Sequence, residues 1–442
     1  MLTGFPYYRD LNHKILAGRD VRYSQWIGQG TGRPNQRIED RPLTYPRIGI
    51  YAGKGCSHSW LWFADLFERV GFFDLVFLDE DHIRAGGLRF LDCLAISGGD
   101  TIAMAEGLGR EGAEELGSFL EKGGLYLGSC AGAYLPLNSS KEHLRDFNFV
   151  AAKITNLTKE LPDSLQLPEK SLTPYGCSYI FHPVREAVEL NAGSTPPFAG
   201  RGTFPAPLFG GPGMIPGRDS QVLACYSGFT SQTLFLVDPD LAKETLLGQA
   251  AVIRNPLGRG CLVLFGPHFE HPYFPTANQL VSDLIYWELS QTSRPKKPGD
   301  HRPSATTLTG AGLKKWIKGL KREISNSRIV ANGLETLPIQ WLIGNKIYQP
   351  LKVRFFLEAS WTRLDWLANQ PDLAVSEGEE KNLTEKAIQL TFLLRDLKNQ
   401  IDAGQDTLPS AETLFKELQF FTRRFLNIYF KSQWSAFKPS RN

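Results

Sequence analysis

Residues 124–134 read GLYLGSCAGAY, an apolar run that breaks into a turn of small residues. The apolar run predicts a buried strand, and the turn predicts a sharp entry into a helix. Gly128 and Gly132 stand two positions on either side of Cys130, which is the spacing of a nucleophile elbow. Glycine at both positions lets the backbone pass a strained residue without a Cβ clash. We expect the dipole of the following helix to lower the pKa of the Cys130 thiol; a cysteine simply buried in a glycine-containing turn is the alternative.

Apolar runs and helical periodicity alternate on both sides of this turn. Strands are expected at residues 47–51, 74–78, 93–97, 222–226, 234–237, 250–254 and 261–265, and helices at 60–70 and from about 100 to 120. The last two strands are separated by Asn-Pro-Leu-Gly-Arg-Gly, which predicts a hairpin. Strands that alternate with helices predict an α/β fold whose parallel sheet is covered by helices on both faces.

The composition divides the chain into four parts. Residues 291–309 are rich in proline and charged groups, as a linker is, and beyond them the periodicity becomes helical. Leu414, Leu418, Phe421 and Phe425, for example, fall on one helix face. Helices are also expected near residues 311–329, 350–368 and 381–402. The expected parts are an irregular N-terminal arm (1–46), the α/β domain (47–290), the linker (291–309) and an α-helical domain (310–442).

The overall composition excludes several classes of protein. The 442 residues are 42% hydrophobic and 12% aromatic, which excludes a largely disordered chain. A formal net charge of +3 gives no reason to expect nucleic acid or a membrane as a partner. The six cysteines form no CxxC pair, the histidines have no metal-binding spacing, and the N-terminus has no signal-peptide pattern. We therefore expect a reduced, cytoplasmic protein with no transmembrane helix, no metal site and no cofactor.

The strand at residues 261–265 is followed by Gly-Pro-His-Phe-Glu, which places His268 and Glu270 just past a strand end. A thiol nucleophile needs a base, and the base needs a carboxylate to fix its tautomer. Because the carboxyl ends of parallel strands meet at one edge of a sheet, His268 can reach Cys130. We expect these three residues to form a catalytic triad. His271 is a rival base with a poorly placed carboxylate neighbour; a histidine packed in a proline-containing loop is the alternative for either one.

A second turn, Ser-Gly-Gly-Asp at residues 97–100, also follows an expected strand. Glycines at a strand end expose backbone N–H groups in the turn. The N–H of Gly99 and that of Ala131, the residue after the cysteine, are expected to form an oxyanion hole. Gly98 and Asp100 of the same turn are expected to contact the substrate.

In chain order, the strand with SGGD, the strand with GSCAGAY and the segment GRGCLVLFGPHFE resemble the class I glutamine amidotransferase-like superfamily. Within it, the chain looks most like the amidotransferase-like domain at the amino terminus of eukaryotic biotin–protein ligases and its free-standing microbial form. The motifs AGKGCSHS and LFGGPG add to a resemblance that covers roughly residues 46–290. It implies a flavodoxin-like sheet of the class I amidotransferase type, with Cys130, His268 and Glu270 as the triad and Gly98-Gly99 as the oxyanion turn.

The resemblance implies a cysteine-dependent amidase or amidotransferase that acts on glutamine or a related small carboxamide through a thioester. The sequence also departs from that group, because nothing after residue 290 resembles a biotin ligase and no phosphate-binding loop of an ATP-dependent synthetase is present. The alternative is a catalytically silent ligand-binding or regulatory module. Its helical domain would then dock a partner protein.

The helical domain could be tethered by the linker, or it could close over the strand ends. Trp361, Trp366 and Trp434 favour docking, because such large rings need an apolar partner. The alternative is that these rings fill the core of the helical domain itself.

Overall fold

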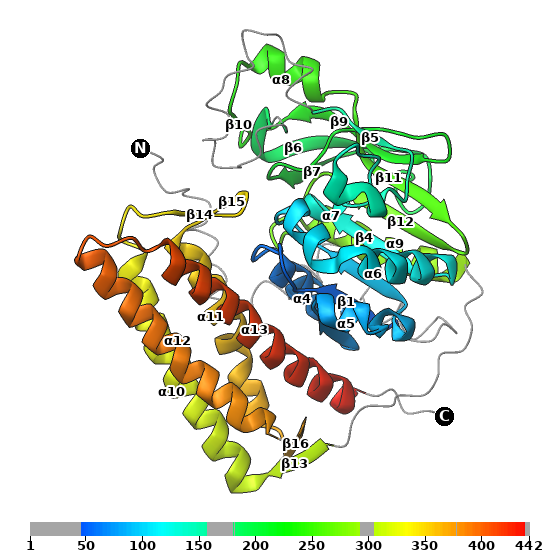
Figure 1. The fold of residues 1–442 in the computed structure, drawn as a ribbon. Helices are drawn as coiled ribbons and strands as arrows, with labels where there is room; N and C mark the ends of the chain where they lie inside the picture. Colours follow the sequence, from blue (N-terminus) through cyan, green and yellow to red (C-terminus); the bar gives the residue numbers. More distant parts are fainter. Residues whose placement is uncertain (1–45, 157–179, 181, 292–304, 377, 438–442) are drawn as a thin grey trace, which may run out of the picture.

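The structure, a computed structural model, describes residues 46–156, 180, 182–291, 305–376 and 378–437. Nearly all of the expected N-terminal arm and most of the expected linker lie outside these residues. Figure 1 shows an α/β part followed by four long helices.

Five of the described strands run parallel and form one side of the sheet, as far as its edge. They are β1 (Ile48–Tyr51), β2 (Leu75–Leu78), β3 (Cys93–Ile96), β4 (Leu125–Ser129) and β12 (Gly260–Phe265). Their order across the sheet is β2-β1-β3-β4-β12, which is the flavodoxin-like order 2-1-3-4-5 when they are numbered along the chain. Every residue of β1, β3, β4 and β12 is buried, as expected of parallel strands that helices cover on both faces. The predicted fold class is confirmed.

The helices of the α/β part lie around its sheet (Figure 1). They are α4 (Trp60–Arg69), α5 (Glu80–Arg84), α6 (Thr101–Glu121), α7 (Ala131–Tyr134), α8 (Pro239–Leu246) and α9 (Pro275–Gln291), with short 3₁₀ turns at Gly87–Phe90 and Glu142–Phe147. Helix α8 lies beside the antiparallel strands of the sheet (Figure 1). Helix α6 starts at Asp100, whose side chain accepts hydrogen bonds from the backbone N–H groups of Ile102 and Ala103. An N-cap of this kind satisfies amide groups that have no partner inside the helix.

The middle of the chain extends the sheet with antiparallel strands, which the sequence did not predict in this number. They are β5 (Lys153–Ile154), β6 (Val184–Ala192), β7 (Thr203–Leu208), β8 (Met214–Ile215), β9 (Gln221–Phe229), β10 (Leu234–Phe235) and β11 (Ala250–Leu257). Strand β11 pairs antiparallel with β12, which confirms the predicted hairpin. The short connection between β11 and β12 requires them to run antiparallel, because parallel neighbours need a long crossover between them.

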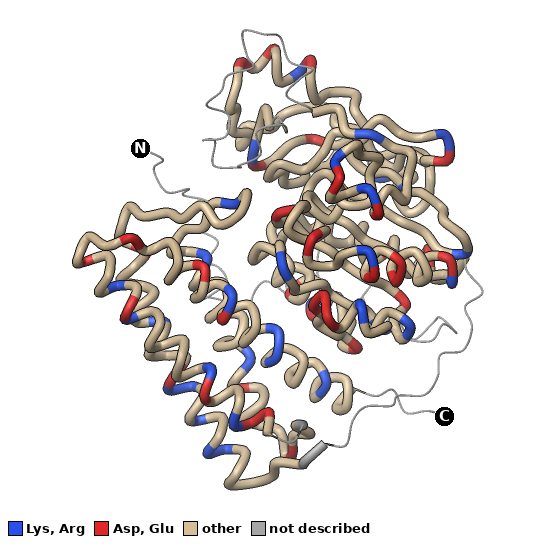
Figure 2. The backbone as a smooth tube through the Cα atoms, in the orientation of Figure 1, with Lys and Arg blue, Asp and Glu red and all other residues tan. Residues whose placement is uncertain are grey.

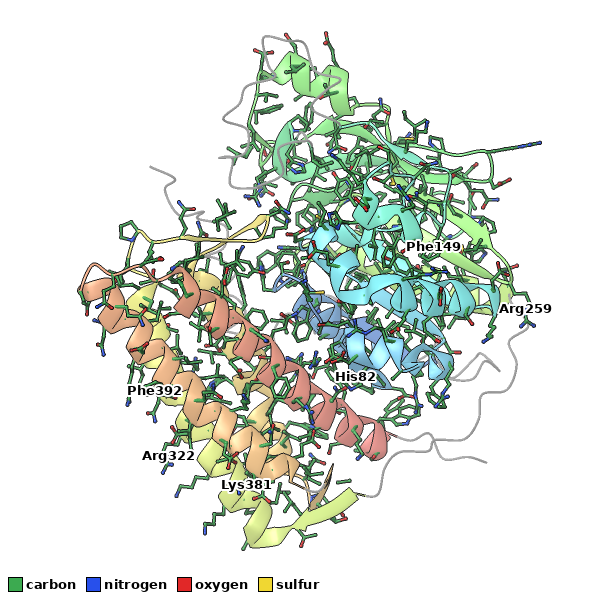
Figure 3. All side chains as sticks on the ribbon, in the orientation of Figure 1. His82, Phe149, Arg259, Arg322, Lys381 and Phe392 are labelled. Carbon is green, nitrogen blue, oxygen red and sulfur yellow. The ribbon has the colours of Figure 1, made fainter. Side chains whose placement is uncertain are left out.

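The C-terminal region contains the predicted helices. They are α10 (Gly310–Leu334), α11 (Pro350–Ala368), α12 (Glu379–Asp402) and α13 (Leu408–Phe437). Their inner faces are apolar, whereas Phe392, Arg322 and Lys381 project from the outer side (Figure 3).

The region also contains short strands, which the sequence analysis did not expect in the linker (291–309) or the α-helical domain (310–442). Strand β13 (Ala305–Thr309), placed in the linker by composition, pairs antiparallel with β16 (Asp372–Ser376). Strands β14 (Trp341–Ile343) and β15 (Lys346–Tyr348) form a hairpin. Both ladders are too short to produce an alternating pattern that could be distinguished from a loop.

Helix α13 covers the edge strand β2 of the described sheet. The side-chain amide of Asn427 accepts a hydrogen bond from the backbone N–H of Phe77 at 2.9 Å and donates one to its carbonyl at 3.0 Å. One turn earlier, Arg423 pairs with Asp79 at 2.6 Å. The helix thus supplies the partners that a further strand would give to this edge.

A buried ion-pair cluster joins the two parts of the molecule. Arg363 on α11 is fully buried and pairs with Asp65 at 2.7 Å and with Glu68 at 2.5 Å, both on α4. The hydroxyl of Tyr429 donates to the other oxygen of Glu68. The C-terminal region therefore packs directly against the α/β part.

Two of the three tryptophans that favoured docking pack within the C-terminal region. The ring of Trp366 packs against Tyr429, 5.3 Å between centroids, and Trp361 lies 4.3 Å from the guanidinium of Arg328. Other rings cross between the two parts, including Phe356 against Trp60 and Phe430 against Phe77, so docking combines apolar contacts with the buried ion pairs. In the part of the chain that the structure describes, no helix is long and apolar enough to cross a membrane.

Candidate active site

Cys130 lies at the tip of a tight turn between β4 and α7. Its backbone has φ 51° and ψ −109°, a conformation that a residue with a side chain rarely adopts. A Cβ atom at Gly128 would lie 2.3 Å from the carbonyl oxygen of Gly132, and one at Gly132 would lie 2.1 Å from that of Ile96. Both glycines are therefore required by the close approach of the backbone, as the motif predicts.

The helix after Cys130 is short. Helix α7 spans only Ala131–Tyr134, about one turn, so its aligned peptide dipoles are few. The pKa of the thiol is lowered, as expected, and a neighbouring imidazole is the main cause that lowers it.

That imidazole is His268, which follows β12 as predicted. Its Nδ1 lies 2.7 Å from Oε1 of Glu270, and both side chains are buried. Glu270 also accepts hydrogen bonds from the hydroxyls of Ser97, at 2.6 Å, and Ser129, at 2.8 Å. These partners hold the carboxylate in place, and the carboxylate fixes the orientation of the ring.

The charges of Cys130 and His268 stabilise each other. Burial raises the pKa of the Cys130 thiol, but the charge of His268 and a hydrogen bond to it outweigh burial, and the net effect lowers the pKa. Burial lowers the pKa of His268, yet Glu270 and the cysteine together raise it to about 9. Each partner therefore favours the charged form of the other, a thiolate beside an imidazolium.

His271, the rival base, lies in a different environment. Its ring packs edge-on against Trp62 at 4.5 Å between centroids, and its Nδ1 accepts from the backbone N–H of Tyr273. Burial and the nearby charge of His268 hold its pKa well below the usual range. The ring of His271 is therefore held in its neutral form and is engaged by other residues. His268 is the better-placed base.

Of the two residues whose N–H groups are expected in the oxyanion hole, Gly99 lines the cavity and Ala131 directly follows Cys130. Gly98 and Gly99 line the cavity beside Cys130, and a Cβ at Gly98 would lie 2.6 Å from the His268 ring. Among the described residues, the N–H groups of Gly99 and Ala131 donate to no protein acceptor. They are thus available to a ligand.

Both carboxylate oxygens of Asp100 have partners within the protein. One caps α6, and the other accepts from the backbone N–H of Asn345 at 2.8 Å. Asp100 therefore also holds the turn of the β14–β15 hairpin; its contact with a substrate stays a prediction.

The cavity beside Cys130 has a volume of about 90 Å³, several times the space that one water molecule needs. Its walls from the α/β part include Trp62, His58 and Phe209. The opposite wall comes from the C-terminal region and consists of Lys346, Ile347, Gln349, Leu351, Lys352 and Phe355. Of the two relations considered for the C-terminal region, the structure has the one in which it closes over the strand ends.

Sequence analysis missed that second wall. Lys346 and Gln349 lie in or just after a short hairpin, and no motif marks them. Arg185 also lines the cavity, and no motif marks it. Two other lining residues lie in motifs that the sequence analysis quoted: His58 in AGKGCSHS and Phe209 in LFGGPG. Within the described ranges, no group of three or more His, Cys, Asp or Glu side chains is placed to hold a metal ion.

The charged pair predicts an unusual pH profile for Cys130. Its thiolate is lost only as the pH falls through the lowered pKa of the thiol, and the imidazolium persists until the pH rises through about 9. We expect iodoacetamide to alkylate Cys130 at neutral pH at least ~10-fold faster than an ordinary thiol, and His268→Gln to shift this reactivity to alkaline pH. Mass spectrometry of the alkylated peptides measures both. Cys225, a partly buried thiol whose pKa burial raises, is the internal control, and equal rates for the two thiols would contradict this prediction.

No protein-family model and no curated protein matches the sequence. Several solved structures are similar to it in fold. A protein assigned as a subunit of GMP synthase from Thermoplasma acidophilum is 14% identical, covers 56% of this chain and 97% of its own, and has a TM-score of 0.36. A glutamine amidotransferase from Thermotoga maritima is 11% identical, covers 56% of this chain and 86% of its own, and has a TM-score of 0.32.

A ThuA-like protein from Bacteroides uniformis is 14% identical, covers 57% of this chain and 97% of its own, and has a TM-score of 0.35. At such identities and TM-scores the likeness carries no information about chemistry. What the site can do must be argued from its own geometry.

Proposed function

We propose that this protein is a cysteine-dependent amidase or amidotransferase-like hydrolase that acts on a small carboxamide. The observation that carries the proposal is the arrangement of Cys130, on a strained turn, beside a histidine that a buried glutamate orients. The resemblance of the motifs to the amidotransferase-like domain of biotin–protein ligases agrees with this chemistry, and we include that relationship in the proposal.

The reaction would proceed through a thioester. The Cys130 thiolate attacks the amide carbon, and the N–H groups of Gly99 and Ala131 stabilise the oxyanion that forms. The His268 imidazolium gives its proton to the leaving nitrogen, the C–N bond breaks, and ammonia or an amine departs. Neutral His268 then takes a proton from water, which attacks the thioester and releases the carboxylic acid and the thiolate.

The experiment is to incubate the full chain with glutamine and other small carboxamides and to measure ammonia release. Hydroxylamine should trap the acyl group as a hydroxamate, and intact-mass measurement should detect the acyl-enzyme. A protein that forms no acyl adduct, yet is protected by these amides from alkylation at Cys130, would instead be the silent ligand-binding module.

A further inference from the structure

The cavity beside Cys130 is lined by three cationic side chains from distant parts of the chain. Lys346 comes from β15, Lys352 from α11 and Arg185 from β6. Lys346 is the only charged residue of the β14–β15 hairpin, which reaches toward the α/β part (Figures 1 and 2). The cation cluster therefore exists only when the C-terminal region is packed against the sheet.

Two of the three cations, Lys352 and Arg185, lie against aromatic rings. The Lys352 ammonium donates to the carbonyl of Ile347 and lies 4.8 Å from the centre of the Tyr348 ring. The Arg185 guanidinium stacks over Phe209 at 5.2 Å, and the same ring lies 5.8 Å from His268. The cluster thus surrounds the space in front of the candidate nucleophile.

The described residues that line the cavity include no aspartate or glutamate. Glu270 lies behind His268 and has three donors of its own, and Glu186, which interacts with its chain neighbour Arg185, does not line the cavity. Burial lowers the pKa of Lys352 to about 7, and the charges of Lys346 and Arg185 contribute to this shift through repulsion. An anion in the cavity would relieve it.

We propose that the substrate is an anionic amide, a carboxamide whose other end carries a carboxylate and no ammonium group, and that Lys346, Lys352 and Arg185 bind this carboxylate. The monoamide of a short dicarboxylic acid, such as glutaramate, has this chemistry. Glutamine differs from glutaramate by an ammonium group, for which the described cavity wall offers cations and no acidic side chain. The inference that the ligand is an amide rests on the proposed function. The inference that the cavity selects an anion does not rest on it.

Two alkylating reagents of nearly equal size test the charge selectivity without any need for activity. Iodoacetate is an anion and iodoacetamide is neutral, so the ratio of their rates at Cys130 reports on the potential in the cavity. We expect Lys346→Gln and Lys352→Gln each to lower that ratio on the order of 5-fold. Because both reagents meet the same thiolate, a change in the pKa of Cys130 cancels in the ratio.

The matched control is Lys318→Gln, an exposed lysine of α10, which should leave the ratio unchanged. Circular dichroism of each variant shows that it is folded. An unchanged ratio in both cavity variants would overturn the proposal.

A panel of ligands tests the substrate class by protection of Cys130 from iodoacetamide. Glutaramate should protect at a concentration at least ~10-fold lower than neutral glutaramide, as one lost charge-assisted hydrogen bond implies. L-glutamine should protect less well than glutaramate. Equal protection by the anion and the neutral diamide, or stronger protection by glutamine, would overturn the inference.

The outcome of this panel is separable from that of the proposed function. Ammonia release from glutaramide and glutaramate at equal efficiency would support the amidase and refute the anion site. Selective protection by glutaramate without release of ammonia would support the anion site and refute the amidase.

Discussion

Replacing the sulfur of Cys130 with oxygen, in Cys130→Ser, should lower the rate of amide hydrolysis on the order of 10⁴-fold, since members of a catalytic triad act as a unit. A serine hydroxyl has a much higher pKa than a thiol, so the stable anion beside the His268 imidazolium is lost. The change is nearly isosteric and should leave the free energy of unfolding almost unaltered. Steady-state ammonia release and urea denaturation measure the two effects.

Cys225→Ser is the matched control for this substitution. Cys225 lies on β9, is partly buried, and has a pKa that burial raises, so its thiol takes no part in the proposed chemistry. We expect its activity to stay within about 2-fold of the wild type, as for substitutions away from special features. Comparable losses in the two variants would show that the effect of Cys130→Ser is structural.

The sequence was sufficient to predict that Cys130 lies on a strained turn and that His268 and Glu270 pair, because these features are local. Gly128 and Gly132 are required within five residues of backbone, and His268 and Glu270 are two residues apart. The parallel order of the strands then brings the two segments together, since strands of one sheet end at one edge.

The second wall of the cavity could not be predicted in this way. Lys346 and Lys352 reach Cys130 only through the packing of the C-terminal region on the sheet, and no spacing in the sequence encodes that contact. Asp100 illustrates the same limit, because its role depends on the distant amide of Asn345. Contacts between separately folded segments depend on the shape of both surfaces, which periodicity does not describe.

Arg363→Met should lower the free energy of unfolding by about 3–5 kcal/mol, because it leaves Asp65 and Glu68 without their cation at a buried interface. The guanidinium is fully buried and also donates to the carbonyl of Ala359 at 2.8 Å. Methionine fills much of the same volume but supplies no donor. Urea denaturation followed by circular dichroism measures the change.

Lys321→Met is the control for Arg363→Met. Lys321 pairs with Asp365 at 2.6 Å, but the two side chains are 41% and 75% exposed. An exposed pair of this kind contributes about 0–1 kcal/mol. If the two substitutions cost the same, the buried cluster does not hold the two parts together.

The pairing of Asn427 with Phe77 crosses 350 positions of the chain, and this has a consequence for biosynthesis. A ribosome completes the sheet long before it makes α13, so the outer edge of β2 emerges without the amide that later occupies it. An unoccupied strand edge is a template on which another polypeptide can add. Nascent chains and fragments that end before α13 should therefore aggregate through this edge. By occupying the edge of β2, helix α13 prevents that association.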